Sequence, residues 1–186
     1  MRAKSCSHWG LVLWMLAVTI STTAGTRNSG TARRCGIDQD LPAQRIFADS
    51  DGKHGWREYR SVKDVPEIQL DAGGAFAWLW AGRDGHVLIR IEEPGEDFSA
   101  YTDYCFSKNG QLEQLRFELW TAWGWGYREE GPIANGALAP QTLDFFSTEN
   151  EEPITKPDQA DDIHDALRPH LYLRKSQLPF ARLLHR

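Results

Sequence analysis

The sequence predicts a single α+β domain that is mostly β, built on one curved antiparallel meander of five to seven strands. Three turn dipeptides indicate the meander, because Asp84-Gly85, Pro94-Gly95 and Asn109-Gly110 each separate runs rich in β-branched and aromatic residues. Short helices at the N- and C-terminal ends are expected to cover the sheet. The sequence carries no catalytic, zinc-binding or nucleotide-binding motif, so it indicates a fold more clearly than a function.

The first 24 residues have the three-part layout of a secretory signal peptide. Arg2 and Lys4 precede an apolar run that covers at most residues 9–20, and small and polar residues follow it. These 12 residues are fewer than the roughly 20 that a helix needs to span a bilayer. Cleavage is therefore expected, with an uncleaved anchor as the open alternative.

The mature chain, residues 25–186, has the length of one domain, and its polar start at residues 25–34 is expected to be a mobile leader. Loss of two positive charges with the signal peptide changes the formal net charge from −5 to −7. An acidic balance argues against nucleic acid as a partner. We expect a secreted or periplasmic protein with no stable membrane span, whose partner is a small ligand or another protein.

Two of the three cysteines, Cys35 and Cys105, remain after signal cleavage. In an oxidising compartment a pair of cysteines predicts one disulfide, which here closes a loop of about 70 residues. A catalytic cysteine is the alternative, but neither cysteine has a histidine in its neighbourhood.

Two-residue loops at the three turn dipeptides fix the register of the meander. The first loop places Trp80 opposite Ile89, and the third places Asp103 opposite Arg116 as a pair of opposite charges. Cys105 and Trp120 share the mixed face with Asp103. The opposite, apolar face is expected to hold Trp78, Trp80, Val87, Ile89, Ile91, Phe98, Ala100, Thr102, Tyr104, Leu115, Phe117 and Leu119.

The fourth run is expected to continue as one strand to Tyr127 and to curl at Gly124 and Gly126, which turns Trp123 and Trp125 inside. Beyond it, Asn135-Gly136 predicts a further hairpin turn and residues 143–146 a further strand.

Near the N-terminal end, residues 41–47 are interpreted as a short helix and residues 56–59 as a short strand. Near the C-terminal end, Asp158 can cap a helix that places Ala160, Ile163 and Leu167 on one apolar stripe before Pro169 stops it. The segment after it, up to Arg186, is expected to dock on the body of the domain.

Two clusters of polar residues are candidates for a functional site. Glu92, Glu93, Glu96 and Asp97 crowd one turn, and a calcium ion would relieve their repulsion. The preferred interpretation is a solvated turn or a patch met by the basic C-terminus. His164 lies among aspartates, so an acid–base pair, a metal site and the polar face of a helix are all open. The sequence predicts no cofactor and no metal.

Six tryptophans in the mature chain are the remaining signal, since an indole ring can stack on a sugar or line an apolar cavity. The alternative is a purely structural role, in which these rings fill the hydrophobic core. The favoured hypothesis is a non-catalytic protein that binds an apolar or aromatic-compatible small ligand. One alternative is a protein-interaction domain with its surface around Trp120 and the basic tail. The other is a hydrolase acting on a sugar or ester. The expected ligand-binding residues are Trp78, Trp80, Phe117, Trp120, Trp123 and Trp125.

Overall fold

The computed structural model describes residues 33–49, 55–66 and 74–185. The chain divides into two units, Met1–Gly30 and Thr31–Arg186, and all described elements belong to the second. The expected signal peptide and most of the expected leader lie outside the described residues. Arg33–Arg34 form strand β1, which pairs with β2 (Ile37–Asp38).

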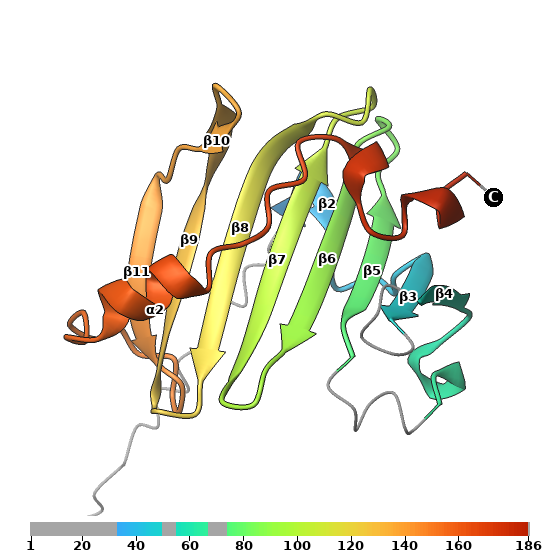
Figure 1. Ribbon diagram of the computed structural model, residues 1–186. Helices are drawn as coiled ribbons and strands as arrows, with labels where there is room; N and C mark the ends of the chain where they lie inside the picture. Colours follow the sequence, from blue (N-terminus) through green and yellow to red (C-terminus); the bar gives the residue numbers. More distant parts are fainter. Residues whose placement is uncertain (1–32, 50–54, 67–73, 186) are drawn as a thin grey trace, which may run out of the picture. The chain divides into compact units, whose positions relative to one another are not determined.

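The second unit is mostly β and is built on one open antiparallel sheet of nine strands, which is more than the five to seven expected (Figure 1). The strand order is β10-β9-β8-β7-β6-β5-β3-β4, and β11 also pairs with β9. The strands are β3 (Arg45–Asp49), β4 (Trp56–Tyr59), β5 (Phe76–Ala81), β6 (Val87–Pro94), β7 (Phe98–Phe106), β8 (Leu112–Thr121), β9 (Trp125–Ala134), β10 (Ala137–Leu138) and β11 (Thr142–Ser147). The helical elements are short: η1 (Val62–Asp64), α2 (Ala160–Ala166), η2 (Lys175–Gln177) and η3 (Ala181–Leu183).

The expected short helix over residues 41–47 is wrong, because this region enters β3 and pairs with both β4 and β5. Pairing on both sides buries Phe47 and Ala48. Tertiary pairing therefore outweighs the local helix signal. The strand expected at residues 56–59 is confirmed as β4.

The first hairpin differs from its expected register by one residue. Three residues close the turn rather than two, with Gly82 N–H bonded to His86 O at 2.8 Å and Gly85 at φ 89°. Trp80 therefore lies opposite Leu88 instead of Ile89. A shift of one residue moves Trp78 and Trp80 to the opposite face of the sheet.

The second and third hairpins keep the expected faces for different reasons. In the second, the two-residue loop is Glu96-Asp97 rather than Pro94-Gly95, so Ile91 lies opposite Thr102, not Phe98. The loop has moved by two residues, which leaves the faces unchanged. In the third, a three-residue loop is offset by a bulge in β8, so Asp103 lies opposite Arg116 as expected.

The run from Trp120 to Tyr127 is a hairpin and not one curled strand. β8 ends at Thr121, and β9 starts at Trp125 after a turn in which Gly124 has φ 87°. The expected close approach at a glycine is found at Gly126, where a Cβ would lie 2.4 Å from Leu119 O and 2.5 Å from the Phe146 ring. The turn at Asn135-Gly136 and the strand at residues 143–146 are both confirmed.

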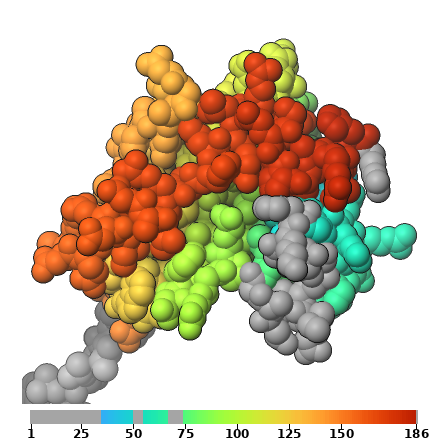
Figure 2. Space-filling model, in the orientation of Figure 1, coloured from blue at the N-terminus to red at the C-terminus, as the bar shows by residue number. Residues whose placement is uncertain are grey.

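The C-terminal segment (residues 158–185) lies across one face of the sheet, here called the front face, from β9 to β5 (Figures 1 and 2). The expected helix is α2, with Ala160 buried and Ile163 and Leu167 packed on the core. A side-chain hydrogen bond ties the segment to the sheet, since Tyr104 Oη donates to His170 O at 2.7 Å. The apolar front-face residues include Phe47, Leu79, Ile89, Ile91, Tyr104, Phe106, Leu115, Phe117, Leu119 and Tyr127.

The expected disulfide is confirmed on the other side of the sheet, the back face, where Cys35 joins Cys105. It holds the N-terminal segment against a small cluster in which Ile37 packs with Trp80 and Leu88. The back face also carries the Asp103 carboxylate, whose ion pair is with Arg90 of β6 at 2.7 Å.

Candidate functional site

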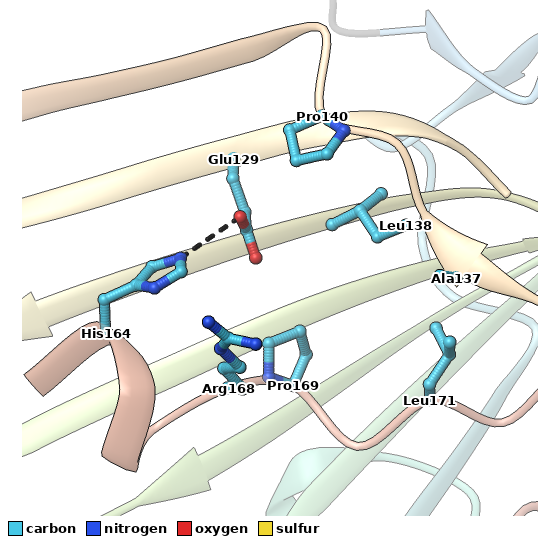
Figure 3. A pocket seen from close by; sticks show the side chains of 8 residues that line it. All are labelled: Glu129, Ala137, Leu138, Pro140, His164, Arg168, Pro169 and Leu171. Atoms are coloured by element: carbon cyan, nitrogen blue, oxygen red, sulfur yellow. Dashed lines mark hydrogen bonds and ion pairs between the residues drawn. The ribbon is translucent and has the colours of Figure 1, made fainter. Parts of the chain in front are cut away.

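A pocket of about 320 Å³ opens on the front face between the β9–β10 edge and the C-terminal segment (Figure 3). Ala137, Leu138 and Pro140 form one wall, and Pro169 and Leu171 form the other. Glu129 from β9, His164 from α2 and Arg168 complete the lining. The pocket is thus largely apolar with a few convergent polar side chains, which is the usual composition of a small-molecule site.

Local sequence explains why a hollow forms here. The Asn135-Gly136 turn has two residues with positive φ, 52° and 77°, and this tight turn leads directly from β9 into β10. Strand β10 is short and ends at Leu138. On the opposite wall, α2 ends before Pro169, and the chain continues without helical packing toward Leu171. Two short walls therefore stand over β9 without filling the space between them.

Glu129 is the central polar group of the pocket. Its side chain projects from the front face of β9, and the residue is only 6% exposed. Among the described residues its one hydrogen-bond partner is His164, whose Nε2 lies 3.3 Å from Oε2. This contact is long, and a carboxyl group can accept several hydrogen bonds, so Glu129 has capacity for a further donor supplied by a ligand.

His164 reaches Glu129 because of the way α2 docks. Ala160 is buried and Ile163 packs on the core, so the next position, four residues after Ala160, also faces the sheet. The imidazole is half-buried at the wall of the pocket (Figure 3). The open interpretation of His164 thus becomes specific: it forms a pair with a carboxyl group 35 residues away in sequence.

Tyr127 lies two residues before Glu129 on the same face of β9 and packs beside the His164 ring, with ring centroids 5.1 Å apart. Its hydroxyl is buried and has no hydrogen-bond partner within the described part of the chain. Burial, and then the charge of Glu129, raise the pKa of Tyr127 far above its usual value. The hydroxyl therefore keeps its proton and places an unsatisfied polar group behind the pocket.

Arg168 supplies positive charge on the far side of the pocket. Its guanidinium is mostly exposed and pairs with Asp165, Nη2 to Oδ1, at 2.5 Å. The other guanidinium nitrogens carry N–H donors that can bind a ligand. The pocket therefore offers an acceptor at Glu129 and donors at Arg168, with apolar walls on either side.

The six expected ligand-binding residues do not line one cavity. Phe117 and Trp125 are buried in the front-face core, so they fill space rather than line it. Trp123 is 50% exposed at the tip of the β8–β9 hairpin, since that segment turns instead of curling inward. The other three lie on the back face: Trp78, Trp80 and Trp120.

Sequence reasoning missed Glu129 and Arg168. A signal for Glu129 does exist, because strict alternation from Trp125 through Tyr127 places an acidic side chain on an apolar face. A carboxyl group in such a position is a candidate site residue. No sequence pattern singles out Arg168, which is exposed and lies just after the end of α2.

The four acidic residues expected to crowd one turn, at positions 92, 93, 96 and 97, do not lie on one side of the sheet. Glu92 lies opposite Tyr101 on the back face, whereas Glu93 lies opposite Ala100 on the front face, and Glu96-Asp97 form the loop. Alternation along a strand is the reason. Across the described residues, no group of three His, Cys, Asp or Glu side chains is placed to hold a metal ion.

Comparison of the chain with protein-family models, with curated proteins and with solved structures found no match. Within the described ranges, no helix is both long and apolar enough to cross a membrane. The class is therefore defined by the molecule itself: a disulfide-linked antiparallel open-sheet protein with an edge pocket.

Proposed function

We propose that this protein is exported and binds a small molecule in the pocket between the β9–β10 edge and the C-terminal segment. The ligand has an apolar body and an uncharged head group that both donates and accepts hydrogen bonds, such as a carboxamide or a hydroxyl. The observation that carries this proposal is the buried Glu129 carboxyl, whose one hydrogen-bond partner among the described residues is His164 at 3.3 Å.

Export is supported by the sequence of the first 24 residues and by the disulfide, which fits an oxidising compartment. Binding without transformation is supported by the pocket residues, which include no serine, threonine or cysteine nucleophile and so leave attack by water as the route to hydrolysis.

The charges at the pocket decide the head group. A carboxylate head would be attracted by Arg168 but repelled by Glu129, and an ammonium head would be attracted by Glu129 but repelled by Arg168. An uncharged head avoids both costs: its N–H or O–H donates to Glu129, and its oxygen accepts from Arg168. The apolar walls then bury the rest of the ligand, which contributes roughly 0.8 kcal/mol for each CH₂ group that is fully buried.

Hexanamide and N,N-dimethylhexanamide test the proposal, because they share the apolar chain and the carbonyl but only hexanamide has N–H donors. Ligand-observed NMR should show hexanamide binding about tenfold to a hundredfold more tightly, since the second molecule leaves the buried Glu129 unsatisfied. Glu129→Leu removes the acceptor and should therefore remove most of this preference. The matched control Glu130→Leu makes the same change on the opposite face of β9 and should keep it.

Equal binding of the two amides by the wild-type protein would contradict the proposed role of Glu129, and no binding of either would contradict the pocket as a ligand site. The same spectra report catalysis. Release of hexanoate would contradict simple binding and support the alternative of a hydrolase, in which His164 and Glu129 act on water as an acid–base pair.

A further inference from the structure

The back face of the sheet carries a second hollow, which is independent of the front-face pocket. Its volume is about 300 Å³, and it is lined by Arg90 of β6, Tyr101 of β7, and Glu118 and Trp120 of β8. Both aromatic side chains are half-buried, so each keeps part of its ring surface accessible. Three neighbouring strands thus present two rings and two charged groups in one place.

Glycine in the neighbouring strand sets the position of Trp120. Gly126 lies opposite Trp120, and without a Cβ there the ring of Phe146 from β11 reaches across β9. The Phe146 and Trp120 rings meet edge to face, with centroids 5.0 Å apart. The indole is therefore held against a fixed support and does not need to order when a ligand arrives.

Glu118 ties the charged groups of the hollow together. It accepts hydrogen bonds from Arg116 at 2.7 Å, from Arg128 at 2.9 and 3.2 Å, and from Trp120 Nε1 at 2.9 Å. Burial alone would raise the pKa of Glu118, but the hydrogen bond from Arg128 and the charges of Arg116 and Arg128 together lower it. Glu118 is thus ionised at neutral pH and is fixed in place.

Charge in this network is nearly balanced. Arg90 forms a two-point ion pair with Asp103, at 2.7 and 3.0 Å, and Glu118 lies between two further arginines. Glu92, which lies opposite Tyr101, supplies one more carboxyl group nearby. Glu130 lies opposite Arg116 and Asp144 lies opposite Arg128, so carboxyl groups slightly outnumber arginines and no excess of positive charge is left to attract an anion.

We propose that this hollow is a binding site for a neutral saccharide. An accessible indole and phenol ring can stack on the apolar faces of pyranose rings, and the guanidinium group of Arg90 can donate hydrogen bonds to hydroxyl groups. Near-neutral charge disfavours anionic and cationic ligands relative to an uncharged polyol. The site is preorganised, since Trp120 is held by its hydrogen bond to Glu118 and Arg90 by its ion pair with Asp103.

Three neutral hexasaccharides, namely cellohexaose, maltohexaose and chitohexaose, serve as probes in isothermal titration calorimetry. At least one should bind, and its affinity should change less than about twofold between low and high salt because neither partner carries net charge at the contact. Trp120→Ala should weaken binding about tenfold. The control Trp123→Ala removes an exposed indole outside the hollow and should leave affinity unchanged.

Failure of all three saccharides to bind the wild-type protein would overturn the proposal, as would equal losses from Trp120→Ala and Trp123→Ala. Trp120→Phe is the second variant in case the alanine variant does not fold, since it keeps a ring in contact with Phe146 and should retain more affinity than alanine. Glu129→Leu should leave saccharide binding intact, which separates this site from the front-face pocket.

Discussion

Phe180→Ala is expected to lower the free energy of unfolding by about 3–5 kcal/mol, the usual cost of removing a buried phenylalanine ring. Phe180 is 0% exposed and stacks on Phe47 at a centroid distance of 4.7 Å, while Trp56 packs on it at the same distance. It is the main anchor between the C-terminal segment and the β3–β4 end of the sheet. Urea denaturation followed by circular dichroism measures the change.

The control is Leu143→Ala on β11, where the side chain is 50% exposed and the expected change is within about 0.5 kcal/mol. A loss below about 1 kcal/mol for Phe180→Ala would show that the C-terminal segment does not pack on the front face in solution. In that case the wall formed by Pro169 and Leu171 would also be absent.

Replacement of both Cys35 and Cys105 by serine is expected to cost about 4 kcal/mol of stability. The disulfide closes a loop with a sequence separation of 70 residues, and the chain-entropy estimate for such a loop is of this size. It also holds Ile37 over Trp80 and Leu88 on the back face. The denaturation midpoint in urea should therefore fall in the double-serine protein.

Reducing agent supplies the matched test of the disulfide. It should lower the midpoint of the wild-type protein to that of the double-serine protein and should leave the latter unchanged. Equal midpoints for oxidised and reduced wild-type protein would contradict a stabilising disulfide between Cys35 and Cys105.

Much of the sheet was predictable because its information is local. Turn residues mark the hairpins, and alternation assigns the faces of β6, β7 and β8 correctly. The opposition of Asp103 and Arg116 followed from the same pattern, which depends on the order of residues along one chain segment. The bond between Cys35 and Cys105 followed instead from the number of cysteines left after signal cleavage.

The errors come from loop length, which a turn dipeptide does not fix. Asp84-Gly85 suits both a two-residue loop and a three-residue loop that ends in a left-handed glycine. The longer loop moves Trp78 and Trp80 to the back face. These two side chains therefore do not share a face with Phe117, as the expected ligand cavity required. In the third hairpin a bulge cancels the same error, so the register there is correct through compensation.

The front-face pocket was beyond sequence reasoning for a different reason. Glu129 and His164 come from β9 and α2, and only the docking of α2 on the sheet brings them to 3.3 Å. Neither the direction of that helix nor the path of the chain past Pro169 is encoded in a local motif. Arg168 joins them by the same tertiary packing.

The most direct test of the pocket is a ¹⁵N-resolved NMR titration of the intact disulfide-bonded protein with hexanamide. Binding between the β9–β10 edge and the C-terminal segment should give the largest shift changes at the amides of Glu129, Leu138, His164 and Leu171. Largest changes on the back face around Trp120, or an unchanged pattern in Glu129→Leu, would contradict it.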